Sequence, residues 1–357
     1  MMITLTLSSS TGPTQSHQKL PLCRMDTSKA PMTGPGGDRS VGASPSGMEM
    51  HLPVSRKPRK KPLRKSHGTN PNSPIPLLPD RRGMEGMMAV RFGGAKDADP
   101  ISAAQNVMYQ AWDATDRRER VRLAKQALAI SPLCADAYVL LAGEEARSVE
   151  QALAFYRLGV EAGQKAIGPE RFKEYGGHFW GFLETRPYMR ARQGLAVVLW
   201  AMGQHQEAIG HCQAMLELNP NDNQGIRYLL SGYLLSLGHT DALKQLLGQY
   251  EDDGTAMWLY TRALLAFREG SPAADRLAEE AWAENSYVPE ILSGRRPVIA
   301  SQDGYITLGG EDEAGEYAKD NGAVWRATPG AIEWLTRVTS TLVPRPPGRS
   351  AGGKWKQ

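Results

Sequence analysis

The stretch that is richest in metal-binding side chains is HQEAIGHC, residues 205–212. It places two histidines, a glutamate and a cysteine within eight positions, and zinc sites in proteins use these side-chain types. On a helix, however, six steps turn His211 by about 120° from His205, so the two rings face different directions. The spacing also differs from that of the HExxH zinc proteases, whose histidines bind the metal from one helix face. We therefore predict no metal site and no cofactor, and expect Cys212 to pack as a small apolar group.

A second group that could do chemistry is His178 with Glu184. Six residues of irregular chain could bring this acid and base together, as general acid–base catalysis requires. The surrounding residues add neither a nucleophile nor a metal-binding cluster. An enzyme centred on this pair is therefore the interpretation that the sequence supports least, and we predict that the protein is not an enzyme.

The elements that position these residues follow a repeat. Pro132 follows the apolar segment ALAIS and Pro220 follows MLELN. Their separation equals two periods of about 34 residues, the length of a tetratricopeptide helix pair, with about 20 residues to spare. We therefore predict an all-α fold: a tetratricopeptide-like superhelix, or solenoid, of about five helix pairs in residues 99–292. The extra residues form an insertion at about 161–188, and residues 293–340 form a helical cap.

Several stretches outside the generic repeat resemble a known family. They are SPLCADAYVLLAGEEA (131–146), QYEDDGTAMWLYTRALLAF (249–267), NSYVPEILSGRRP (285–297) and EDEAGEYAKDNGAVWRATPGAIEWL (311–335). Together they resemble the suppression-of-tumorigenicity protein family and its soluble, tetratricopeptide-like bacterial relatives, over about residues 99–336. The resemblance implies the helical fold and no catalytic residues. It does not carry over the membrane location of the family's animal members, because this chain has no apolar run of about 18 residues.

A solenoid of this kind binds its partners along the groove that the first helix of each pair lines. Applied to this chain, the groove positions together with the insertion give a set of arginine, glutamine and aromatic side chains, types that suit an acidic or aromatic peptide. The predicted site is Tyr109, Trp112, Trp180, Arg186, Arg190, Gln193, Trp200 and Arg227. The aromatic side chains of the insertion 161–188 have two interpretations: they fill a gap between helices, or they shape the binding surface. We predict a scaffold that holds a protein or peptide segment in its concave groove.

The ends of the chain have another composition. Residues 1–98 are rich in Pro, Gly and Ser, and we expect a disordered arm; residues 341–357 are expected to form a disordered tail. Residues 1–95 carry nine more basic than acidic side chains; since the whole chain carries +4, residues 96–357 carry −5. A basic run could bind nucleic acid or act as a nuclear address, which is the alternative function. This run contains Arg56, Lys57, Arg59, Lys60, Lys61, Arg64 and Lys65.

Signals for export are missing from the sequence. The start MMITLTLSSS lacks the charged and apolar regions of a secretory leader. Cys23, Cys134 and Cys212 are too few and too far apart for a disulfide framework. We therefore expect a cytoplasmic protein without a membrane span. The arm before Met84 is either native or a gene-model extension, because translation could also begin at that methionine.

Overall fold

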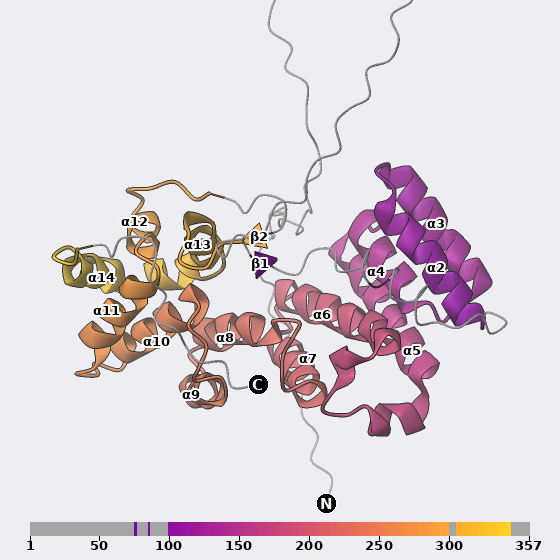
Figure 1. Ribbon diagram of the computed structural model, residues 1–357, viewed down its shortest axis with the longest axis horizontal. Coiled ribbons are helices and arrows are strands. Elements are labelled where there is room, and N and C mark those ends of the chain that lie inside the picture. The colour runs from indigo at the N-terminus through magenta and orange to yellow at the C-terminus, as the bar shows by residue number, and fades with distance from the viewer. Residues whose placement is uncertain (1–74, 77–84, 86–98, 300–304, 344–357) are drawn as a thin grey trace, which may run out of the picture. The chain divides into compact units, whose positions relative to one another are not determined.

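The computed structural model describes residues 75–76, 85, 99–299 and 305–343 of the chain (Figure 1). The chain divides into two compact units, Met1–Pro71 and Asn72–Gln357, and every described residue belongs to the second. The basic run of the predicted arm and most of the predicted tail lie outside the described residues. The described residues 75–76 and 85 come from the part of the chain that the sequence assigned to the arm.

Within the described ranges the fold is all-helical apart from one pair of two-residue strands. The strands are β1 (Ile75–Pro76) and β2 (Tyr305–Ile306), which pair antiparallel with Ile75 opposite Ile306. Two short 3-10 helices, η1 (Phe179–Gly181) and η2 (Leu183–Thr185), precede α6. The helices are α2 (Pro100–Asp113), α3 (Arg117–Ile130), α4 (Ala135–Glu144), α5 (Val149–Glu174), α6 (Arg186–Ala201), α7 (His205–Leu218), α8 (Ile226–Leu237), α9 (Thr240–Gln249), α10 (Ala256–Arg268), α11 (Ala274–Glu284), α12 (Val288–Leu292), α13 (Glu311–Ala327) and α14 (Ala331–Thr339).

Short polar side chains begin several of these helices. The Asp99 carboxylate accepts a hydrogen bond from the backbone N–H of Ile101, and the Asp116 carboxylate accepts one from Glu119. Ser148 and Thr255 do the same for α5 and α10. Because the first N–H groups of a helix have no partner inside it, such caps fix where each helix starts.

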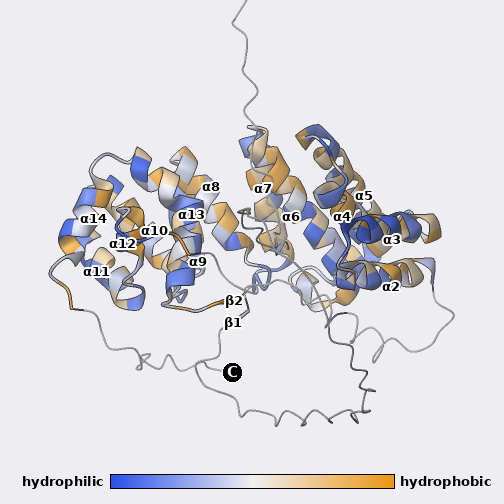
Figure 2. Ribbon diagram, turned by 90° about the horizontal axis from the view of Figure 1, so that it is seen from above, coloured by the Kyte–Doolittle hydropathy of each residue, from blue (hydrophilic) through white to orange (hydrophobic). Residues whose placement is uncertain are grey.

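Consecutive helices from α2 to α11 pack against one another, and alternate helices also meet: α2 contacts α4, α4 contacts α6, and α8 contacts α10. Hydrophobic and hydrophilic residues alternate along the ribbons of the helices (Figure 2), as expected where one face of each helix is buried. The buried apolar side chains form a smaller cluster on α2, α3 and α4 and a larger one on the helices that follow. None of the helices in the described ranges is long and apolar enough to cross a bilayer.

The insertion expected at 161–188 is largely helical. Helix α5 runs through its first half to Glu174, with a change of direction at Gly168, whose φ is 75°, before Pro169. The two 3-10 helices then lead directly into α6. The Phe179 and Tyr188 side chains are buried in the larger cluster, and the Phe172 ring packs between them at centroid distances of 4.8 and 5.1 Å. These three aromatic side chains therefore fill space between helices.

The C-terminal helices return to the middle of the unit. Helix α13 contacts both α8 and α10. The buried carboxylate of Glu313 accepts hydrogen bonds from the backbone N–H of Ala256, at 2.9 Å, and from the Asn285 amide, also at 2.9 Å. Farther along α13, the Asn321 amide lies 3.0 Å from the sulfur of Met257. Helices in the segment predicted as a cap, residues 293–340, therefore contact α8, α10 and α11.

Candidate functional site

Two arginines lie one turn apart on α6. Arg186 and Arg190 are separated by four residues, so their side chains leave the same face of the helix. Arg190 donates two hydrogen bonds to the buried carboxylate of Asp136, in the first turn of α4: one from Nη2 to Oδ2 at 2.6 Å and one from Nε to Oδ1 at 2.8 Å. Gln105 on α2 also donates to Asp136 Oδ2 at 2.8 Å. Side chains from three alternate helices therefore meet at this point.

A second carboxylate, from Glu85, joins the two arginines. Arg186 Nη1 donates to Glu85 Oε1 at 2.9 Å, and Arg190 Nη1 lies 3.2 Å from Oε1 and 3.1 Å from Oε2. The side chain of Glu85 is only 3% exposed, and those of Arg186 and Arg190 are 16% and 13% exposed. We call Glu85, Asp136, Arg186 and Arg190 the carboxylate cluster. Ion pairs buried to this degree form only when their hydrogen bonds are well satisfied.

Aromatic rings flank the cluster. The guanidinium carbon of Arg190 lies 5.4 Å from the centroid of the Trp112 ring, and that of Arg186 lies 5.4 Å from the Trp180 ring, within the range of cation–π attraction. Arg186 Nε also donates to the backbone carbonyl of Trp180 at 2.9 Å. The indole Nε1 of Trp180 is buried and has no hydrogen-bond partner among the described residues.

Burial and charge shift the acidities around the cluster. Burial, with smaller contributions from Glu85 and Asp136, raises the pKa of Tyr109 to about 12. Burial alone lowers the pKa of Arg190, but the carboxylates of Asp136 and Glu85 outweigh it and raise that pKa. Burial and the Asp136 charge also raise the pKa of the Cys134 thiol to about 12. Tyr109 and Cys134 therefore stay protonated near neutral pH, and neither offers an anionic nucleophile.

Five of the eight predicted groove residues meet at this cluster: Tyr109, Trp112, Trp180, Arg186 and Arg190. They do not form an open row, however, because both arginines are paired with carboxylates of the chain itself. Desolvation favours this pairing, since a buried guanidinium without a partner is costly.

The other three predicted residues have separate partners. Gln193 accepts a hydrogen bond from the Gln224 amide at 2.7 Å. The ring of Trp200 stacks on Tyr233, with centroids 3.8 Å apart. Arg227 is held by Asp222 at 3.0 Å and Asp253 at 2.7 Å. These contacts link neighbouring helix pairs.

Neither carboxylate of the cluster is among the groove residues predicted from the sequence. The position of Asp136 gave a signal, because it is the second residue of the predicted first helix of a pair. Glu85 has no such signal: it is a single acidic residue between a methionine and a glycine, outside the helical repeat.

Within the described residues, the His178–Glu184 pair and a metal site do not form. His178 and Glu184 are both exposed, and within the described chain no hydrogen bond or ion pair joins them; Glu184 accepts instead from the Tyr175 hydroxyl at 3.2 Å. Cys212 is buried, and burial raises the pKa of its thiol to about 12. No group of three or more His, Cys, Asp or Glu side chains in the described ranges could hold a metal ion.

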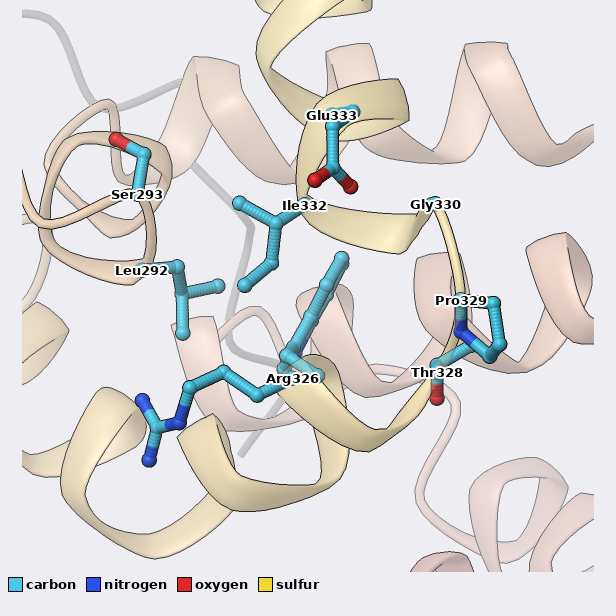
Figure 3. Close-up of a pocket in the computed structure, with 9 residues that line it drawn as sticks. Leu292, Ser293, Arg326, Thr328, Pro329, Gly330, Ile332 and Glu333 are labelled. Atoms are coloured by element: carbon cyan, nitrogen blue, oxygen red, sulfur yellow. The ribbon is translucent and has the colours of Figure 1, made fainter.

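A hollow of about 430 Å³ lies at the C-terminal end, between α12, α13 and α14. Figure 3 shows Ile332 near its centre and Leu292 to one side, with the Glu333 carboxylate above them and the Arg326 side chain below. Its lining contains one basic and one acidic side chain and no histidine or cysteine. This hollow therefore lacks the paired groups that catalysis or metal binding requires.

Comparisons with known proteins point to one family. The family model described as ST7 protein matches residues 94–268. The protein ST7 homolog of Caenorhabditis elegans is 26% identical over 293 residues, which cover 70% of this chain and 53% of that protein. The human suppressor of tumorigenicity 7 protein-like is 26% identical over 277 residues, 70% of this chain and 48% of that protein. The chicken protein of the same name is 25% identical over 269 residues, 67% of this chain and 47% of that protein.

The chain spans about half the length of these curated relatives. The matched residues 94–268 run from before α2 to the end of α10 and so include Asp136, Arg186 and Arg190. The chain is therefore similar to proteins of the ST7 family over these residues.

Proposed function

We propose, from the support that the comparisons give to the ST7 family, that this chain is a non-catalytic scaffold for protein interaction. Its helix pairs stack as a tetratricopeptide-like solenoid, and it holds a segment of a partner protein against the surface formed by α2, α4 and α6. The cytoplasm is the proposed location, since the described cysteines, Cys134 and Cys212, are both free.

The contacts between alternate helices support the solenoid. Where helix pairs stack, the first helices of successive pairs lie beside one another and form a continuous inner surface. The contacts of α2 with α4, of α4 with α6, and of α8 with α10 fit this arrangement. Helix α13 contacts α8 and α10, so the part of the inner surface proposed for binding is that of α2, α4 and α6.

One observation carries the proposal. Arg186 and Arg190 bind the carboxylate of Glu85, which is 101 and 105 residues away from them in the chain. Charge-assisted hydrogen bonds from two guanidinium groups are strong and directional. The surface of α6 therefore already binds an acidic side chain that comes from outside the helix pairs.

Affinity capture with a matched pair of variants tests the proposal. Arg186→Gln removes a cation that contacts Glu85 and the Trp180 carbonyl. Arg192→Gln makes the same change on the same helix, where Arg192 contacts the Tyr188 hydroxyl and His211. We expect a protein captured by the full-length chain and by Arg192→Gln to be lost with Arg186→Gln, all three having the same circular dichroism. Equal capture by all three would reject the surface.

Charge reversal is a poorer choice for this test. Arg190→Glu would place a new carboxylate against the buried Asp136, and Arg227→Glu would place one against Asp222 and Asp253. Like charges in buried positions destabilise the fold, so a lost partner would report unfolding.

A further inference from the structure

Glu85 is the member of the carboxylate cluster that does not belong to a helix pair. It precedes α2 in the chain, yet its side chain is only 3% exposed. Its two oxygens lie within hydrogen-bond distance of Arg186 once and of Arg190 twice. Two guanidinium groups that converge on one carboxylate are the usual means by which proteins recognise a carboxylate ligand.

The charges of the remaining cluster show what must occupy the position of Glu85. Asp136 takes two hydrogen bonds from Arg190. Arg186 also donates to the backbone carbonyl of Trp180, which carries no net charge. Without Glu85, the guanidinium groups of Arg186 and Arg190 face the carboxylate of Asp136 alone. One positive charge then remains uncompensated in a largely desolvated place. Such a place favours an anion, because an uncompensated buried charge is costly.

The side chains around Glu85 indicate which kind of anion the site suits. The rings of Trp112 and Trp180 lie against the two guanidinium groups, and apolar faces of this kind suit the methylene stem of a glutamate. The buried Nε1 of Trp180 is a free donor among the described residues, and a peptide carbonyl from an incoming segment could accept from it.

We propose that Arg186 and Arg190 form a receptor for a glutamate side chain of a partner protein, and that Glu85 is the ligand that occupies it in cis. This inference rests on the proposed function, because it names the chemistry that the same surface recognises. A partner binds by displacing Glu85. The tethered Glu85 acts at an effective concentration on the order of millimolar, so its removal increases the affinity of the site for an acidic segment.

A peptide titration on the full-length chain tests the receptor. The probe is an end-blocked, fluorescein-labelled peptide of residues 83–87, GMEGM, and the matched control is GMQGM. We expect Glu85→Ala to bind GMEGM at least about tenfold more tightly than the wild-type chain does, because no tethered carboxylate then competes for the site. We also expect Glu85→Ala to bind GMEGM at least about tenfold more tightly than GMQGM, since each lost charge-assisted hydrogen bond costs about this factor. In the Glu85→Ala chain, Arg186→Gln should abolish the binding and Arg192→Gln should preserve it.

Equal binding of GMEGM and GMQGM, or no binding of either to Glu85→Ala, would overturn the receptor. Should Glu85→Ala fail to fold, Glu85→Gln keeps the shape of the side chain and is titrated in its place under the same criteria. The outcome is separable from the proposed function. If the chain discriminates the two peptides but captures no protein, the receptor stands and the scaffold function fails. If the chain captures a protein through Arg186 but does not discriminate the peptides, the scaffold function stands and the receptor fails.

Discussion

At the scale of single residues, burial decides what an ion pair contributes. Asp136 is fully buried and accepts from both Arg190 and Gln105. Asp136→Ala removes the carboxylate that accepts two hydrogen bonds from Arg190 and leaves that guanidinium paired with Glu85. We therefore expect the free energy of unfolding to fall by about 3–5 kcal/mol. Denaturation by urea, followed by circular dichroism, measures the loss.

An exposed ion pair is the control for Asp136. Glu145 lies 2.5 Å from Lys125, with 35% and 56% of the two side chains exposed. Glu145→Ala should lower the free energy of unfolding by less than about 1 kcal/mol, because water screens the pair. Losses of the same size in the two variants would contradict the buried network.

His211 makes stability depend on pH. Its Nδ1 accepts a hydrogen bond from Arg192 Nε at 3.2 Å, which the neutral ring can do. Burial lowers the pKa of His211, and the charges of Arg192 and Arg157 lower it further, while Glu207 opposes them. The unfolded chain, with a histidine pKa of about 6.5, then binds the proton more readily. The free energy of unfolding should therefore fall as the pH drops from above 6.5 toward the folded pKa.

The substitution His211→Gln isolates this effect. It removes the titrating group and keeps an acceptor for Arg192, so the pH dependence between about pH 7.5 and 5.5 should become flatter. Urea denaturation at several pH values gives the slope for both chains. An unchanged slope would mean that His211 does not titrate differently in the folded state.

Single residues also show how far the sequence could predict the site. The repeat assigned Tyr109, Trp112 and Arg190 to one surface because their positions depend on local helical spacing. The carboxylates that neutralise this surface come from Asp136, 54 residues from Arg190, and from Glu85, 105 residues away. Pairing over such distances is set by packing of the whole fold, and the spacing of the helices does not reveal it.

At the scale of elements, glycines allow α5 and α6 to approach closely. A Cβ atom at Gly194 would lie 2.1 Å from Cε1 of Tyr156, and one at Gly163 would lie 2.8 Å from Cβ of Tyr188. The Tyr156 ring packs against the larger buried cluster, so it can move little. We expect Gly194→Ala to lower the free energy of unfolding by about 1–3 kcal/mol, through overpacking, as measured by urea denaturation.

The matched control is Gly210→Ala on α7. A Cβ atom there meets nothing within 4 Å, and alanine favours the helix, so the free energy of unfolding should rise by up to about 1 kcal/mol. The two glycine substitutions thus have opposite expected signs. An increase for Gly194→Ala would show that α5 and α6 do not pack in this way.

The sequence predicted the helices better than it predicted their ends. Helices α7 to α11 lie within residues 99–292, where the apolar spacing predicted helix pairs. Thr185 stands at the N-cap position of α6, but its buried hydroxyl donates to the carbonyls of Phe179 and Phe182 and makes no cap hydrogen bond to the helix. Helix α5 continues past residue 161 into the segment that was predicted as an insertion. Pro169 is tolerated because Gly168 adopts a positive φ and a new helical turn begins after it.

At the scale of the whole described unit, the apolar side chains divide into two clusters of different size. The smaller one belongs to the first helix pair, α2 and α3, with α4. In stacked repeats, a terminal pair has a neighbour on one side only and opens most readily. We expect hydrogen exchange, followed by mass spectrometry, to label the amides of α2 and α3 before those of α6 and α8. Equal protection of the four helices would argue against stacked repeats.

The all-helical class of the unit was predictable from periodicity alone, whereas the place of α13 was not. The segment 293–340 was predicted to be helical, and α13 lies within it. Its contacts with α8 and α10 join residues more than 50 positions apart, such as Glu313 with Ala256. This contact limits the proposed binding surface to α2, α4 and α6.

Photo-crosslinking from inside this surface tests the scaffold most directly. Benzoylphenylalanine would replace Tyr109, which lies close enough to Glu85 for that carboxylate to raise its pKa. A second chain would carry the probe at Leu158 of α5, which is 45% exposed. The account predicts that position 109 crosslinks acidic segments of a partner and that Arg186→Gln removes them, while position 158 yields none of these segments. The absence of partner crosslinks from position 109 would contradict the scaffold, and so would crosslinking of the same partner segments from both positions.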